Sequence, residues 1–342
     1  MKVLKNCKIF NSENGLNNLN QDIIYNDQEI LKIKKSSNEN YDNFKQIDID
    51  GRIIFPGLID IHVHFRDPGQ TIKEDIASGA NAAAKGGFTT VVMMPNTYPP
   101  LDSVDNIRLV SEKILNSKIN IYVSPCLSLG RNGKELVDFE TILNNFEDII
   151  FGFSDDGDFL EDQNLIGKAL NILDGNFPLM QHPELLDNHN YNGAINQGKL
   201  SEKYNLIGRP ASAEINAVRS NLEVLKDNPG WVHFQHLSTK GAIRELEIFK
   251  EFNSKVTSEV TPHHLFLDEE EMNLKLDPKF KVNPPLRTME DKQYCVDSLK
   301  NGTIDVIATD HAPHSLIEKK NKFEDCMSGI SWLENAFGFV SE

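Results

Sequence analysis

The chain carries at positions 60–69 the run Asp60-Ile61-His62-Val63-His64-Phe65-Arg66-Asp67-Pro68-Gly69, which overlaps the end of an apolar stretch over residues 53–61. Such a stretch predicts a buried strand. Because successive side chains of a strand alternate between its faces, His62, His64 and Arg66 point the same way. Paired imidazoles suit a zinc ion, and the arginine suits an anion. The run predicts a metal centre beside a carboxylate clamp; the alternative is a chance His-X-His on a solvated face.

The composition is that of an ordinary soluble protein: 342 residues, of which 39% are hydrophobic and 25% charged. No apolar run approaches the roughly 20 residues needed to span a bilayer, and the first residues lack the apolar core of a signal peptide. We therefore expect a cytoplasmic protein without membrane association. The 4 cysteines lie far apart, which argues against a thiolate metal site and against a disulfide framework.

The formal net charge of −16 argues against a nucleic-acid partner, because binding to phosphates needs clustered lysine and arginine. It also bears on a small anionic substrate, which the overall field of the protein does not attract. Local cations must then bind it, and the candidates are metal ions and Arg66.

Short apolar segments alternate with amphipathic helical patterns along most of the chain, which is typical of repeated strand-helix units. The expected strands are residues 58–64, 88–94, 119–124, 149–154, 177–182, 231–236, 255–260 and 304–309. The clearest helical patterns cover residues 73–85, 104–115, 165–173, 212–225 and 240–252. This pattern predicts an α/β fold, a TIM-type (β/α)₈ barrel over residues 53–342. Residues 1–52 carry short β patterns and predict a small flanking N-terminal β-sandwich segment.

In such a barrel the chemistry lies at the carboxyl ends of the strands. Five of the expected strands end in imidazoles or carboxylates, namely His62, His64, Asp155, Asp156, His182, His236, Asp310 and His311. A single histidine at a strand end is more often a hydrogen-bonded structural residue than a ligand. The coincidence of five such strands predicts a metal site.

Six motifs resemble those of a known family. They are His62-Val63-His64-Phe65-Arg66-Asp67-Pro68-Gly69, Met94-Pro95-Asn96-Thr97, Ser154-Asp155-Asp156-Gly157, His236-Leu237-Ser238-Thr239-Lys240, Asn283-Pro284-Pro285-Leu286-Arg287 and Ala308-Thr309-Asp310-His311-Ala312-Pro313-His314. In this order they look like the dihydroorotases of the amidohydrolase superfamily. The resemblance implies a zinc hydrolase of cyclic amides that interconverts dihydroorotate and N-carbamoyl-aspartate in pyrimidine biosynthesis.

The resemblance also implies the metal ligands. The six residues that it assigns to metal are His62, His64, Asp156, His182, His236 and Asp310. Two zinc ions per chain would be bridged by Asp156 and a hydroxide, since this branch has an aspartate where many relatives carry a carboxylated lysine. For Asp155 we expect the role of a hydrogen-bond acceptor that shapes the turn.

Carried over in the same way, Asp310 is the catalytic proton shuttle between the attacking water and the departing amide nitrogen. The implied substrate contacts are His64, Arg66, Asn96, Asn283 and His314. For His314 the alternative is a histidine of a surface loop.

Four other histidines are given structural roles. His233 is expected to pack between the barrel and its helices, and His263 and His264 to form structural hydrogen bonds. His311, next to Asp310, is expected to pack or to hydrogen-bond behind a ligand.

Two departures from the family pattern bear on these expectations. The segment over residues 326–334 keeps only Gly329 and the Leu333-Glu334 pair, which puts substrate contacts from that loop in question. Relatives normally continue beyond the position of Glu342 and complete the small sandwich. We therefore expect either a short protein that compensates by forming a homodimer, or a fragment.

Two other functions are weighed against a dihydroorotase. One is another cyclic-amide hydrolase, of the allantoinase, hydantoinase or dihydropyrimidinase type; Arg66 and Asp156 favour a carboxylated ring instead. The other is a non-catalytic homologue that scaffolds an aspartate transcarbamoylase. Such homologues lose metal ligands, whereas this chain keeps the whole set. Association with that enzyme stays an expectation about partners.

Overall fold

The structure is a computed structural model, and it describes residues 1–11, 15–37, 41–187, 193–272 and 276–341. Within it the chain forms two compact units, Met1–Leu58 and Ile59–Glu342. The first unit is built from strands alone, and the second from strands and helices.

The first unit is one mixed five-stranded sheet with the order β3-β2-β1-β4, in which β5 also pairs with β1. Its strands are β1 (Lys2–Asn11), β2 (Gly15–Tyr25), β3 (Ile30–Lys35), β4 (Lys45–Asp48) and β5 (Ile53–Ile54). Buried Asp22 accepts hydrogen bonds from the Asn6 amide (3.1 Å), the Ser36 hydroxyl (2.6 Å) and the Tyr41 hydroxyl (2.8 Å). The segment expected to be a small β-sandwich is thus one sheet in this structure, and Asp22 ties Asn6, Ser36 and Tyr41 together.

The two larger sheets of the second unit are parallel and have the orders β6-β7-β8 and β15-β14-β13-β10-β9. Their strands are β6 (Leu58–Val63), β7 (Phe88–Met93), β8 (Asn120–Val123), β9 (Phe153–Ser154), β10 (Leu179–Gln181), β13 (Val232–Phe234), β14 (Val256–Val260) and β15 (Val306–Ile307). All eight fall inside the segments expected from the sequence. Isolated parallel bridges, Val123 with Ile150 and Val63 with His311, join the two sheets at both ends.

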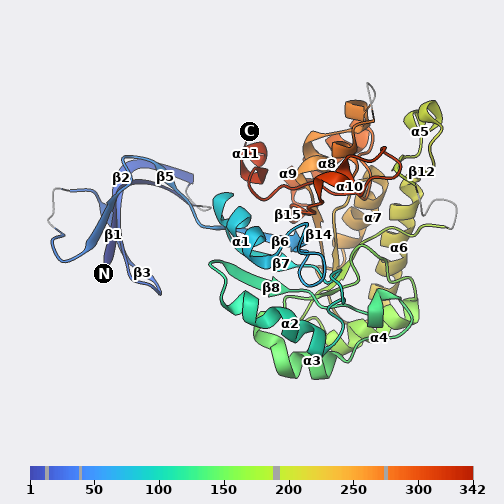
Figure 1. The fold of residues 1–342 in the computed structure, drawn as a ribbon, viewed down its shortest axis with the longest axis horizontal. Coiled ribbons are helices and arrows are strands. Elements are labelled where there is room, and N and C mark those ends of the chain that lie inside the picture. Colours follow the sequence, from blue (N-terminus) through green and yellow to red (C-terminus); the bar gives the residue numbers. More distant parts are fainter. Residues whose placement is uncertain (12–14, 38–40, 188–192, 273–275, 342) are drawn as a thin grey trace. The chain divides into compact units, whose positions relative to one another are not determined.

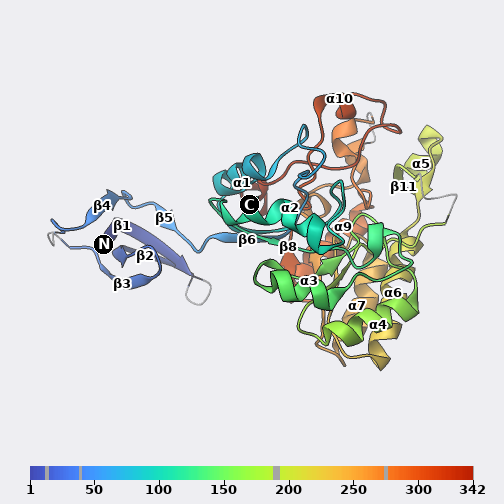
Figure 2. The same ribbon diagram turned by 60° about the horizontal axis from the view of Figure 1, so that its bottom comes forward.

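Helices connect these strands and lie outside the sheets (Figures 1 and 2). The helices are α1 (Ile76–Lys85), α2 (Val104–Leu115), α3 (Phe139–Phe146), α4 (Gln163–Leu173), α5 (Lys199–Tyr204), α6 (Ala211–Asp227), α7 (Lys240–Lys250), α8 (Pro262–Phe266), α9 (Met289–Asn301), α10 (Leu316–Lys319) and α11 (Ala336–Val340). Polar N-caps define the starts of several, for example Asp75 before α1 and Thr288 before α9, each with a capping box. None of the helices in the described residues is long and apolar enough to cross a membrane.

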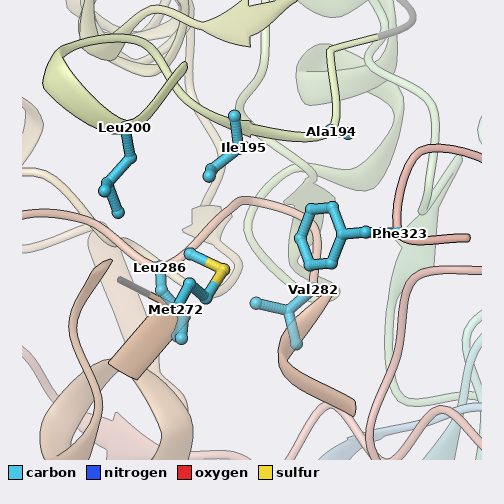
Figure 3. Packing of buried hydrophobic residues seen from close by; sticks show 7 residues of the cluster. All are labelled: Ala194, Ile195, Leu200, Met272, Val282, Leu286 and Phe323. Carbon is cyan, nitrogen blue, oxygen red and sulfur yellow. The ribbon is translucent and has the colours of Figure 1, made fainter. Parts of the chain in front are cut away.

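An apolar cluster lies beside the strand ends, and its side chains point toward one another (Figure 3). It brings the short strand β11 (Ile195–Asn196), which pairs with β12 (Gly208–Arg209), against segments from much later in the chain. Its buried members are Ala194, Ile195, Leu200, Met272, Val282, Leu286 and Phe323. Val282 and Leu286 flank Asn283, so this cluster fixes the backbone that carries an expected substrate contact.

Candidate metal centre

The expected ligands come from the carboxyl ends of five strands. His62 lies within β6 and His64 just beyond it, and the others follow β9, β10, β13 and β15. A cavity of about 920 Å³ is lined by His64, Asp156, His182, His236 and Asp310 together with Arg66, Asn96 and Asn283. Because the strands are parallel, their carboxyl ends meet at one edge, and residues far apart in sequence share one cavity.

Four of the six side chains form the tightest group. His62 Nε2 lies 3.3 Å from His64 Nε2 and 3.4 Å from Asp156 Oδ1. His64 Nε2 lies 3.2 Å from Asp156 Oδ2 and 3.0 Å from Asp310 Oδ1. One ligand atom from each of His62, His64 and Asp156 falls within 4.8 Å of the others, which is compatible with a single metal ion. These side chains are buried, so the ion would be shielded from bulk water.

His236 and His182 add to this group beside Asp156. His236 Nε2 lies 3.7 Å from Asp156 Oδ1, and the rings of His182 and His236 have centroids 4.4 Å apart. Buried Asp156 Oδ1, His182 Nδ1 and His236 Nδ1 have no hydrogen-bond partner among the described residues. Buried polar atoms are normally satisfied, so these atoms fit a group that binds them. Imidazoles and carboxylates are among the ligands that bind zinc in proteins.

The electrostatics favour the ligand form of two of these residues, Asp156 and His182. Burial opposes the charge of Asp156, but His62 and His64 outweigh it and lower the pKa of this carboxyl well below its usual range. Burial, reinforced by His236, lowers the pKa of His182 well below its usual range and keeps the imidazole neutral. An ionised carboxylate and a neutral imidazole are the states that coordinate a metal ion.

Two of these residues have strained backbones. His236 has a φ of 33° and Asp310 a φ of 47°, in the left-handed region that side chains with a Cβ rarely adopt. Asp60 holds the segment before Asp310 in place: it accepts hydrogen bonds from the Thr309 amide (3.0 Å) and the Thr309 hydroxyl (2.5 Å). Strain maintained by buried contacts is common where a side chain must be aimed at a site.

Adjacent Asp155 and Asp156 point to different places. Asp155 Oδ1 accepts the amides of Leu127 (2.9 Å) and Ser128 (3.0 Å), and Oδ2 accepts the Ser128 hydroxyl (2.5 Å). As expected, Asp155 is a hydrogen-bond acceptor that shapes the turn, and it leaves Asp156 alone to face the histidines.

Arg66 lies on the cavity wall with 8% of its surface exposed. Its Nε donates to the Pro313 carbonyl (3.3 Å), and its Nη2 is 3.5 Å from His314 Nε2. It forms no salt bridge with the carboxylates in the described part of the chain. A buried guanidinium without a protein carboxylate suits an anionic ligand.

The other expected substrate contacts already have partners in the protein. Asn96 Oδ1 lies 2.8 Å from His64 Nδ1, and Asn283 Nδ2 lies 3.2 Å from His182 Nε2. Asn283 Oδ1 accepts from Arg209, which also pairs with Glu184. Both asparagines therefore orient a histidine as well as lining the cavity.

His314 is not the surface histidine of the alternative interpretation, because only 3% of its side chain is exposed. Its Nε2 lies 2.7 Å from the Ser328 carbonyl, so it links the Arg66 wall to the loop that departs from the family pattern.

The structural histidines mostly behave as expected. His264 Nδ1 contacts the Thr261 hydroxyl (2.8 Å), and His263 Nδ1 accepts from the Trp332 indole (3.0 Å). His311 pairs with Glu74 (2.9 Å). His233 is buried, and its ring is hydrogen-bonded to Glu259, a partner that sequence reasoning missed. Glu259 contacts His62 across 197 residues, a separation that no local pattern reveals.

Comparison with known proteins agrees with this geometry. A family model described as "Dihydro-orotase-like" matches residues 51–242. Proteins named dihydroorotase from Bacillus cytotoxicus and Carboxydothermus hydrogenoformans are 38% and 40% identical over 98% of this chain, which spans 77% and 76% of their lengths.

Solved structures resemble the fold at lower sequence identity. The L-hydantoinase from Arthrobacter aurescens has a TM-score of 0.81 at 20% identity, over 99% of this chain and 76% of its own. A D-hydantoinase from a Thermus species has a TM-score of 0.79 at 21% identity, over 99% of this chain and 76% of its own. The α/β fold is therefore that of the hydantoinases, and the resemblance noted in the sequence motifs is confirmed. By the extent and identity of the sequence matches, the chain belongs to the dihydroorotase family.

Proposed function

We propose that this protein is a zinc-dependent dihydroorotase that hydrolyses and reforms the cyclic amide of dihydroorotate in pyrimidine biosynthesis. The observation that carries the proposal is that Arg66, which forms no salt bridge among the described residues, and the His62–His64–Asp156–Asp310 group line or border one cavity. A carboxylated ring would meet a cation at one end and the metal group at the other. The names of the relatives support the same activity.

The proposed framework is a closed (β/α)₈ barrel over residues 53–342 with a small β segment over residues 1–52. Support comes from the hydrogen bonds at the junctions of the two sheets. The Phe151 amide donates to the Val123 carbonyl (2.9 Å), and the His64 amide donates to the His311 carbonyl (2.8 Å). The first contact pairs the end of β8 with the segment just before β9. The second pairs the segment after β15 with the end of β6.

Two zinc ions are proposed, with His62, His64 and Asp310 for the first and His182 and His236 for the second. Asp156 would serve both, because its Oδ1 lies near a proposed ligand of each ion, His62 and His236, while its Oδ2 faces His64. Zinc in such a site supplies a water of lowered pKa and polarises the carbonyl under attack.

The remaining chemistry belongs to side chains of the cavity. Arg66 binds the substrate carboxylate through its fork of donors. Asp310, with one oxygen against His64, accepts the proton of the attacking water and returns it to the departing amide nitrogen. Asn96 holds the His64 ring, and Asn283 holds the His182 ring, in the orientation that each needs at the substrate.

A hydantoinase-type activity is the second candidate, since the solved hydantoinases share this fold. Assays of purified protein with dihydroorotate, hydantoin and allantoin distinguish the two. We expect turnover of dihydroorotate; turnover of hydantoin alone would refute the assignment. Metal analysis tests the scaffold alternative, for which a folded, metal-free protein is the expected result.

We also propose that the protein is a cytoplasmic homodimer that associates with an aspartate transcarbamoylase. Light scattering of the protein alone tests the dimer, and light scattering of its mixture with that enzyme tests the association.

A further inference from the structure

Glu259, near the end of β14, is a buried carboxylate with no exposed surface. Its Oε1 lies 2.5 Å from His62 Nδ1 and accepts the backbone amide of His236 at 3.2 Å. Its Oε2 lies 3.1 Å from His233 Nε2. One carboxylate thus contacts a proposed ligand of each zinc ion.

The contact with His62 determines which ring nitrogen can bind a metal. His62 Nε2 faces Asp156 and His64, whereas Nδ1 faces Glu259. An ionised carboxylate only accepts hydrogen bonds, so Nδ1 carries a proton, and in the neutral ring that binds metal Nε2 then keeps its lone pair. A histidine that binds metal commonly donates its other N–H to a carboxylate in this way.

The contact with His236 acts on the backbone. His236 has a φ of 33°, and its amide donates to the same Oε1 that faces His62. The hydrogen bond to Glu259 therefore helps to hold the backbone of His236 in its strained conformation. That conformation directs the His236 ring toward Asp156.

A chain of hydrogen bonds holds the other oxygen of Glu259. The Trp231 indole, which can only donate, donates to the Thr257 hydroxyl (2.7 Å), and that hydroxyl lies 2.8 Å from His233 Nδ1. Since His233 Nε2–H donates to the carboxylate, its Nδ1 accepts from Thr257. Each hydrogen bond of this series is therefore donated in the direction of Glu259.

The charge of Glu259 has no balancing lysine or arginine among the described residues; its ion-pair partners there are His62 and His233. A buried carboxylate paired only with imidazoles, which are neutral unless protonated, is costly. Metal ions held by His62 and His236 would supply the missing positive charge.

We propose that Glu259 is a positioning residue for both halves of the metal centre, fixing the tautomer of His62 and the backbone of His236. This inference rests on the proposed metal-dependent function. It predicts that removing the charge of Glu259 weakens zinc binding at both positions, although Glu259 touches neither ion.

The test compares Glu259→Gln with wild type in zinc content, zinc affinity by chelator competition, and the absorption spectrum of the cobalt-substituted protein. We expect a loss of affinity of about 10- to 100-fold and an altered cobalt spectrum. Glu214→Gln is the matched control: Glu214 is equally buried and accepts from Ser238 and Thr239, but it contacts neither His62 nor His236 among the described residues, so the variant should keep wild-type affinity.

Two outcomes would overturn the inference. One is a folded Glu259→Gln protein with wild-type affinity and cobalt spectrum. The other applies if Glu259→Gln does not fold. Glu259→Asp keeps the charge but moves it away from His62, so a wild-type zinc affinity of the Glu259→Asp protein also rejects the role. A wild-type protein that binds no metal would instead refute the proposed function, and the inference with it.

Discussion

Asp310 Oδ1 lies 3.0 Å from His64 Nε2, although 246 positions separate the two residues in the sequence. The contact joins the segment after β15 to the end of β6, and Asp310 also borders the cavity. The same carboxylate can therefore face the metal group with one oxygen and a substrate with the other.

Asp310→Asn should abolish most of the hydrolysis while leaving a folded protein that still contains zinc. An amide cannot accept and return the proton, and general acid–base catalysis commonly contributes about 10²- to 10⁴-fold to a rate. We expect kcat for dihydroorotate to fall by that factor. Metal content and the thermal unfolding curve serve as controls, and a variant with near wild-type kcat would exclude Asp310 as the proton shuttle.

The neighbouring aspartates should separate metal binding from stability. Asp156→Asn should lower the zinc content, because Asp156 faces His62, His64 and His236. Asp155→Asn should retain zinc but lower the free energy of unfolding by about 1–3 kcal/mol, since the new amide leaves buried donors of Ser128 poorly paired. Metal analysis and denaturant titration of both variants check this. The reverse pattern would assign the bridging role to Asp155.

Arg66→Ala should mainly weaken substrate binding. A hydrogen bond to a charged group contributes about 1.5–3 kcal/mol, which corresponds to an increase in KM of roughly 10- to 150-fold. Arg66→Lys should lie between wild type and Arg66→Ala, because lysine keeps the charge but loses the fork of donors. Steady-state kinetics with dihydroorotate measure both. An unchanged KM in Arg66→Ala would show that the carboxylate binds elsewhere.

Stability should fall as the pH drops from about 6.5 toward 3, in part because of His264. Burial, with help from His236 and Arg287, lowers the pKa of His264 to about 3. Below pH 6.5 His264 binds a proton in the unfolded chain but stays neutral in the folded protein. It therefore lowers the free energy of unfolding by up to about 1.4 kcal/mol per pH unit. His264→Gln keeps a donor for the Pro284 carbonyl but cannot titrate.

Denaturant unfolding of wild type and His264→Gln at several pH values measures that contribution. The difference in unfolding free energy should shift in favour of the variant as the pH decreases through this window. A difference that is constant with pH would mean that His264 is protonated equally in both states.

Much of this architecture could be predicted from local patterns. The strand at β6 and the helix at α2 follow from hydrophobic periodicity and from capping residues such as Ser103, which are properties of a few consecutive residues. The motif around His62 and His64 predicted the candidate metal centre because two possible ligands lie two residues apart on one strand. The ends of short strands such as β9 were less predictable, since long-range pairing decides them.

The sequence alone therefore determined the alternating strand-helix order, the family, and the residues with metal-binding and anion-binding chemistry. The tertiary structure decided how they combine: Asp155 turns to the Ser128 loop while Asp156 faces the histidines, and Arg66 remains without a salt-bridge partner in the described residues. It also placed Glu259 between His62 and His233. The physical reason is that hydrogen-bond partners at the ends of parallel strands are set by which strands lie side by side, and residues 62 and 259 carry no local signal of that proximity.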